Sequence, residues 1–426
     1  MSASPANPLD DLYQRYARAV VEHGVGLLPG QDLYIRAMRH ARDLALTVGE
    51  AAYDLGASQV HYRIIDMDEQ AQLVRRASPA AIVDTTQVDI RSWLLEILRS
   101  RSPLLTLSEI GASSHYEQLV REHSTNHGIF LRGLGEIGRA FMHQTVELGQ
   151  SVCAIAPAPS ASWAQRIFPR LPRDEAEHRL MNLLVPLVEI DPQVRAQKLE
   201  YFDQLLERLN ALHIREMHVT GGGNDFRIAL PETARWAYAR MQTNSGQRYF
   251  INFPSEEVFT TPDFRHCSGR MVASRPFRLG SGVRVEGAVL EFENGAVVRS
   301  SATTGAEDLQ RCLAIDAGAR RLGEFALVSR DSPLARVEQF FDHPLLDENA
   351  GSHIAVGHGW KIPFGADPMD DEDALVEMGL NQSAVHTDIV FGSDEITVTA
   401  PQSAKGEVVV MEGGVWSPRL HPVRRR

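Results

Sequence analysis

Side chains suited to binding metal ions recur through the C-terminal half of this 426-residue chain. The candidates are three acidic residues and two histidines, Glu257, Glu324, His353, His386 and Asp388. Carboxylate oxygens can bridge two cations, and neutral imidazoles add nitrogen ligands to each. This combination of residue types is what a pair of divalent metal ions requires, so it indicates a hydrolase built around a dinuclear metal site.

The two glutamates carry different local signals. Glu257 stands beside Glu256, and paired glutamates are usually surface charge. Glu324 precedes an apolar run at residues 325–328, where a buried carboxylate needs a partner to offset its desolvation. Of the two, Glu324 is therefore the stronger candidate when each is considered alone.

The histidines are also ambiguous one at a time. His353 stands among small and apolar residues, where an imidazole is commonly part of the core. His386 and Asp388 alternate across one residue in a strand-like stretch, so both can point to one face. Such a pair can offer one metal ion a nitrogen and an oxygen. The prediction of a metal site therefore depends on all five candidate ligands together, and not on any one of them.

Composition limits the possible classes of function. Net charge is −12, which argues against general attraction to nucleic acid. The three cysteines are far apart and odd in number, so neither a disulfide framework nor a zinc ribbon is indicated. No signal-peptide pattern and no apolar run long enough to span a membrane is found. We therefore expect a cytoplasmic enzyme without a nucleic-acid or membrane partner.

The N-terminal half has an α/β pattern. Apolar residues at helical spacing predict a helix at residues 9–23, and a second helix is expected at 41–55. Strands are predicted at residues 32–37, 60–65, 104–107 and 151–156. Strand–helix–strand order indicates a parallel sheet, and two longer helices are expected at residues 175–187 and 192–212.

The pattern becomes strand-rich after the glycine run at residues 221–223, which predicts a turn because no phosphate-loop residues follow it. Strands are expected at residues 226–230, 251–253, 283–292, 296–300, 325–328, 396–400 and 407–411. One helix is expected at 306–322. The predicted fold is an α/β domain at residues 1–220 and a strand-rich α+β domain at 221–426, which carries the metal site.

Four segments around these residues resemble the aminopeptidase T family of dinuclear metallopeptidases. They are NFPSEEVFT at 252–260, AGARRLGEFALV at 317–328, DENAGSHIAVG at 347–357 and VHTD at 385–388. Weaker similarity lies at residues 28–31, 56–58, 156–164 and 223–226, so the resemblance covers nearly the whole chain.

The resemblance implies a metal site and a reaction. All five candidate ligands fall on the family's ligand positions, with Glu324 as the bridging carboxylate of two divalent ions, zinc or cobalt in related enzymes. Such ions activate a water that attacks a peptide carbonyl. Glu256 is a candidate to meet the substrate's free amino terminus. A homodimer that encloses the active site and favours short peptides is also implied.

Trp360 departs from the family pattern, which has a tyrosine seven residues after His353. Indole has no hydroxyl, so it cannot ligate a cation through oxygen, and its N–H is only a donor. Loss of one oxyanion donor typically costs about 100- to 1,000-fold in rate. Three interpretations follow: Trp360 only reshapes the pocket, His358 replaces the tyrosine as a ligand, or the pocket serves another substrate.

The predicted function is metal-dependent removal of N-terminal residues from short peptides. One alternative is hydrolysis of a small non-peptide amide, as the change at Trp360 would allow. Others are a mononuclear iron oxygenase and a non-catalytic binding protein on the same scaffold. The complete ligand set argues against the oxygenase, because such a site keeps two histidines and one carboxylate. It also argues against the non-catalytic binding protein, whereas Trp360 argues for it.

Overall fold

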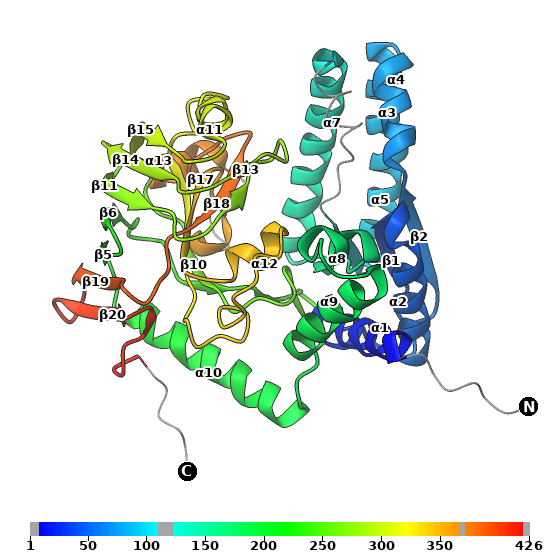
Figure 1. The fold of residues 1–426 in the computed structure, drawn as a ribbon, viewed down its shortest axis with the longest axis horizontal. Coiled ribbons are helices and arrows are strands. Elements are labelled where there is room, and N and C mark those ends of the chain that lie inside the picture. The colour runs from blue at the N-terminus through cyan, green and yellow to red at the C-terminus, as the bar shows by residue number, and fades with distance from the viewer. Residues whose placement is uncertain (1–7, 110–121, 366–370, 421–426) are drawn as a thin grey trace, which may run out of the picture. The chain divides into compact units, whose positions relative to one another are not determined.

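The structure, a computed structural model, describes residues 8–109, 122–365 and 371–420 (Figure 1). The chain forms two compact units, Met1–Glu189 with Arg240–Pro254, and Ile190–Ala239 with Ser255–Arg426. The boundary expected at residue 220 stays a prediction, since it marks a change of sequence pattern and not the edge of a compact unit.

A parallel four-stranded sheet forms the centre of the first unit, in the order β2-β1-β3-β4. The strands are β1 (Leu33–Met38), β2 (Val60–Ile65), β3 (Leu104–Ser108) and β4 (Cys153–Pro157). Leu33, Ile35 and Ala37 alternate along β1 and are buried on the face where α2 (Arg42–Asp54) packs. The alternation that predicts a strand therefore also defines the core.

Helices surround this sheet. They are α1 (Pro8–Ala19), α3 (Met67–Arg76), α4 (Pro79–Asp84), α5 (Arg91–Ser100), α7 (Ser124–Met142), α8 (Ala161–Ile167) and α9 (Arg173–Val188). Helices α3, α4, α5 and α7 add to the predicted elements. In Figure 1 they extend upward from the sheet, with α3, α4 and α5 in blue and α7 in teal. The unit also contains the short pair β8 (Arg240–Gln242) and β9 (Arg248–Phe250).

The second unit contains an antiparallel five-stranded sheet in the order β18-β17-β16-β10-β7. Its strands are β7 (Ala237–Tyr238), β10 (Val258–Thr260), β16 (Leu322–Leu327), β17 (His353–Gly357) and β18 (His386–Val390). Every residue of β16 and β17 is buried. Polar side chains on these two strands therefore lie inside the protein.

An eight-stranded sheet completes the second unit, in the order β15-β14-β11-β6-β5-β19-β20-β21. Its strands are β5 (Glu216–Gly221), β6 (Asn224–Ala229), β11 (Cys267–Val272), β14 (Val289–Glu293), β15 (Ala296–Ser301), β19 (Thr397–Gln402), β20 (Val408–Glu412) and β21 (Val415–Trp416). A separate pair is β12 (Phe277–Arg278) and β13 (Arg284–Val285). The helices are α10 (Pro192–Ala211), α11 (Ala306–Leu313), α12 (Pro344–Glu348) and α13 (Glu372–Met378). The glycine run forms the β5–β6 turn, as predicted.

The predicted fold class is confirmed, and three predicted elements are wrong. The single strand expected at 283–292 is two strands, β13 and β14, which belong to different sheets. The helix expected at 306–322 ends at Leu313, and Asp316 then anchors a turn through the backbone N–H groups of Ala319 and Ala384. Residues 251–253 form no strand, since only Asn252 makes an isolated bridge, to Ile155. Over the described residues, no helix combines the length and apolar character needed to cross a membrane.

Candidate metal centre

Neighbouring strands of the five-stranded sheet carry the predicted ligands. They lie on β16 (Glu324), β17 (His353), β18 (His386 and Asp388) and immediately before β10 (Glu257). In the register Glu324 pairs with Ala355, and Ala355 pairs with Asp388. Residues opposite each other on antiparallel strands share a face, and alternation adds His353 and His386 to it.

Ala355 makes room for the two carboxylates beside it. It is fully buried between Glu324 and Asp388 in the register and contributes only a methyl group. Both longer acidic side chains can therefore extend over it. Ala355 is one of the small residues near His353 in the sequence, and in the sheet it has this steric role.

Two groups of possible ligand atoms form among the described residues, and Glu324 belongs to both. Glu257, Glu324 and His353 form one group, while Glu324, His386 and Asp388 form the other, and in each group the atoms lie within 4.8 Å of one another. His353 Nε2 lies 3.5 Å from Glu257 Oε2, and His386 Nε2 lies 3.2 Å from Asp388 Oδ1. Two ligand groups that share one carboxylate are the arrangement of a bridged dinuclear centre.

The backbone orients both imidazoles. His353 Nδ1 lies 3.1 Å from the carbonyl oxygen of Gly351, and His386 Nδ1 lies 2.7 Å from that of His358. A ring nitrogen that donates to a carbonyl leaves the other nitrogen free to coordinate a metal ion. Both Nε2 atoms face the carboxylates, so the two rings fit metal ligation.

Burial and charge perturb the acidic side chains. Burial, reinforced by Glu324 and Asp388, raises the pKa of Glu257 well above its ordinary value. Burial also opposes ionisation of Asp388, but His386 outweighs it and brings the pKa of Asp388 to about 2. Burial opposes protonation of His386, yet Asp388 and Glu324 raise its pKa. Buried carboxylates thus exceed the available positive charge, and divalent cations suit that donor set.

Glu348 is a fourth acidic side chain at this centre, and it is absent from the ligands predicted from the sequence. It is the last residue of α12 and forms a side-chain hydrogen bond with Asp388. Burial, with Asp388 and Glu257 nearby, raises the pKa of Glu348 well above its ordinary value. The signal for it was its place five residues before His353 in the segment DENAGSH.

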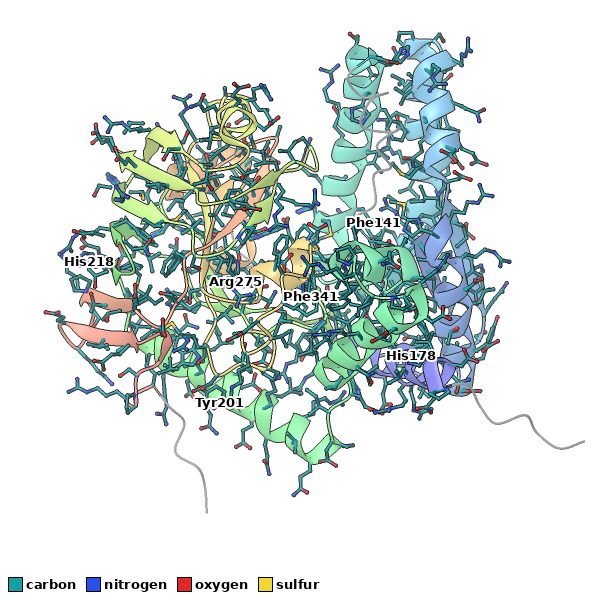
Figure 2. The ribbon with its side chains drawn as sticks, in the orientation of Figure 1. Phe141, His178, Tyr201, His218, Arg275 and Phe341 are labelled. Carbon is teal, nitrogen blue, oxygen red and sulfur yellow. The ribbon has the colours of Figure 1, made fainter. Side chains whose placement is uncertain are left out.

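The neighbouring Asp347 holds the segment that carries Glu348. Its carboxylate accepts backbone hydrogen bonds from Phe341 and His343, both at 2.8 Å. Burial raises the pKa of Asp347 to about 7, and Arg275 opposes that shift. Figure 2 labels Arg275 and Phe341 among the side chains of this unit. These contacts fix the start of α12 and therefore the position of Glu348.

Trp360 lies directly against the centre. Its indole Nε1 donates a hydrogen bond to Glu324 Oε2 over 2.7 Å. The ring centroids of Trp360 and His386 are 5.1 Å apart, with the planes tilted by 57°. The carbonyl oxygen of Trp360 accepts from the Thr261 hydroxyl at 2.6 Å, which fixes its backbone. The indole therefore contacts both a carboxylate and an imidazole of the ligand set.

The thermophilic metalloprotease family (M29) matches residues 9–416. The chain belongs to this family. Aminopeptidase T of Thermus aquaticus is 31% identical, over 94% of this chain and 97% of its own. Aminopeptidase AmpS of Bacillus subtilis is 28% identical over the same shares. The solved structure of wild-type AmpT from Thermus thermophilus matches with a TM-score of 0.83 and 28% identity, covering 96% of this chain and 99% of that one.

Membership of this metalloprotease family, together with the aminopeptidase relatives, supports metal-dependent aminopeptidase function and confirms the predicted family. It follows that the chain is a hydrolase and that its family uses a divalent metal.

Two other predicted site residues lie outside the ligand groups. His358 is bound to the centre through its backbone carbonyl, and its imidazole belongs to neither group of possible ligands among the described residues. Glu256 pairs with Lys198, and its backbone N–H donates to Asn349 Oδ1 at 3.1 Å. Their roles as a ligand and as an amino-terminus contact stay predictions.

Proposed function

We propose that this enzyme removes N-terminal residues from short peptides at a dinuclear metal centre. The ligands would be Glu257, Glu324, His353, His386 and Asp388, with Glu348 as a fourth acidic side chain beside them. The observation that carries the proposal is the membership of Glu324 in both groups of ligand atoms. A single-ion site would need no shared carboxylate.

The protein side chains have distinct roles in this proposal. When bound, two divalent ions supply an activated water and polarise the scissile carbonyl group. Glu324 would hold both ions at a fixed separation from a buried strand. His353 and His386, oriented through Nδ1, would each present Nε2. Burial of these side chains limits bulk water around the reacting groups, which strengthens their electrostatic effect.

Trp360 supports a second candidate function, hydrolysis of a small non-peptide amide. The family tyrosine at this position would supply a hydroxyl, whereas this indole donates its only polar hydrogen to Glu324. The remaining aromatic surface can stack on a flat substrate. Peptides remain the first choice, because the ligand set is complete and the relatives are aminopeptidases.

Three finer features belong to the same proposal. The ions would be zinc or cobalt, which suit mixed carboxylate and imidazole ligands. The enzyme would act as a homodimer whose association encloses the site, and it would work in the cytoplasm. These features follow from the family resemblance.

Metal content and a substrate panel test the proposal together. We expect about two ions per chain, as a dinuclear site requires, and hydrolysis of dipeptides that a chelator removes and added zinc or cobalt restores. In Glu324→Ala, metal content and hydrolysis should both be lost. Glu291→Ala is the matched control. Glu291 also lies on a strand, but this strand, β14, belongs to the eight-stranded sheet, and its carboxylate pairs with Arg299.

Two results would contradict the proposal in different ways. Retained hydrolysis in Glu324→Ala would show that the assigned residues are not the site. Two bound ions with turnover of small amides and no turnover of peptides would favour the second candidate function.

A further inference from the structure

Arg36 is a half-buried cation of the first unit that has no hydrogen-bond or ion-pair partner among the described residues. It lies on β1, next to the centre of the four-stranded sheet. Among the described residues, no carboxylate, carbonyl or hydroxyl accepts a hydrogen bond from its guanidinium group. Arginine has five N–H donors and stays charged in proteins, so such a group is costly to leave without an acceptor.

The neighbours of Arg36 do not offset its charge. Burial lowers the pKa of Arg36, and Arg63 lowers it further. The acidic group that opposes this is the thiol of Cys153, but burial raises the pKa of Cys153 to about 11, so the thiol is neutral near pH 7. Nothing among these groups supplies the negative charge that a half-buried guanidinium favours.

Arg63 has partners in the described part of the chain, and Arg36 has none there. The two arginines are opposite each other in the β1–β2 register. Arg63 binds Asp89 at 2.5 Å, and its guanidinium carbon lies 5.4 Å from the ring centroid of Trp93. Trp93 in turn packs edge-on against Tyr34, two residues before Arg36. The aromatic contacts therefore fill the sheet face on the amino-terminal side of Arg36, and they hold Arg63 there.

Thr106 provides a second free donor in the same row. It pairs with Arg36 in the parallel β1–β3 register, so both side chains lie on one face. Its hydroxyl has no hydrogen-bond partner in the described part of the chain, and the residue is half-buried. Neither Thr106 Oγ1 nor a nitrogen of Arg36 is among the fully buried unsatisfied atoms of the described residues, and both residues are partly exposed.

The topology favours a ligand at this place. In the order β2-β1-β3-β4, the connections from β1 and β3 lead in opposite directions, to β2 and to β4. Ligands of open parallel sheets bind outside the carboxyl ends of the strands at such a reversal. Arg36 and Thr106 each lie two residues before the end of their strand, Met38 and Ser108.

We propose that Arg36 and Thr106 form an oxyanion-binding site at the carboxyl ends of β1 and β3. The ligand is a carboxylate or phosphate group: the guanidinium gives it two parallel N–H donors, and the Thr106 hydroxyl gives a third. The site lies within the first unit and does not depend on the proposed metal centre.

The test follows an NMR signal of the Arg36 side chain itself. Small anions can also bind metal ions, so binding to the whole protein would not identify the site. The full-length protein is labelled with ¹⁵N-arginine, and the Nε–H signal of Arg36 is assigned by its loss in Arg36→Lys. We expect acetate or inorganic phosphate to shift this signal saturably. Thr106→Val keeps the strand-forming shape but lacks the hydroxyl, so binding should be about tenfold weaker, as expected for one hydrogen bond to a charged group.

The control is Arg39→Gln, since Arg39 is exposed and pairs with Asp66. It should bind the anion as the unchanged protein does. Saturation by acetate alone would identify a carboxylate source, and saturation by phosphate a phosphoryl source. A shift that does not saturate, that chloride reproduces, or that Thr106→Val leaves unchanged would overturn the site.

Discussion

Trp360 Nε1 and Glu324 Oε2 are joined by a hydrogen bond of 2.7 Å, and Glu324 is the residue that both groups of possible metal ligands share. An N–H donor on a bridging carboxylate fixes its orientation and competes for one of its lone pairs. The indole of Trp360 therefore acts on the carboxylate that both ligand groups share.

Trp360→Phe removes this donor and keeps an aromatic ring. Partners of metal ligands typically contribute about 10- to 100-fold in metal affinity or activity, so we expect a loss in that range. Metal titration followed by dipeptide hydrolysis measures both. Trp360→Tyr is the companion variant: unchanged or improved peptide turnover supports a pocket-shaping role, and a large loss would show that the indole itself is used.

His358→Ala tests whether His358 is a metal ligand or whether Trp360 only reshapes the pocket. The imidazole of His358 lies outside both groups of described ligand atoms, while its backbone carbonyl accepts from His386. We therefore expect His358→Ala to keep its metal content, since the substitution preserves the carbonyl. Loss of metal in this variant, beyond that of Trp360→Phe, would instead make His358 a ligand.

Glu348→Gln tests the acidic side chain that only the structure brings to the site. The substitution keeps the size of the residue but removes a carboxylate that hydrogen-bonds Asp388. Metal affinity should fall about 10- to 100-fold. Glu377→Gln, on the exposed face of α13, is the control and should bind metal normally. Equal metal affinities in the two variants would show that Glu348 does not contribute to metal binding.

Metal affinity should rise with pH. The raised pKa values of Glu257 and Glu348 mean that these carboxyls keep their protons to a higher pH than ordinary glutamates in the metal-free site. Metal ions bind the deprotonated forms, so binding releases these protons and weakens as pH falls. Calorimetry in buffers of different ionisation enthalpy counts the protons. Affinity independent of pH, with no proton release, would contradict this expectation.

The cysteine thiols should be unreactive in the native protein. All three are buried, and burial raises the pKa of each, to about 11 for Cys153. Because the thiolate is the nucleophile, we expect iodoacetamide at pH 8 to leave the native chain unmodified and to alkylate three sites after denaturation. Mass spectrometry reads the number of adducts. Rapid labelling of the native chain would mean that a thiol is exposed by motion.

Local sequence patterns predicted much of the scaffold of the site. Alternating or continuous apolar residues mark β1, β2, β16 and β19, because strands bury side chains in a simple period. The prediction of a helix at 306–322 is wrong because it also relied only on local apolar spacing. Its apolar spacing continues past Leu313, but Asp316 binds backbone groups of residues 319 and 384 and ends the helix.

The amino-acid sequence establishes which side chains are available: five candidate ligands in the order typical of the family, and a tryptophan at position 360. Which of these side chains meet depends on the tertiary structure. The order β18-β17-β16-β10 places Glu324 beside His386 at 3.4 Å, although 62 residues of numbering separate 324 from 386. It also brought Glu348 to Asp388 and left Arg36 without an acceptor among the described residues. Strand order and side-chain partners depend on long-range packing, which no local period encodes.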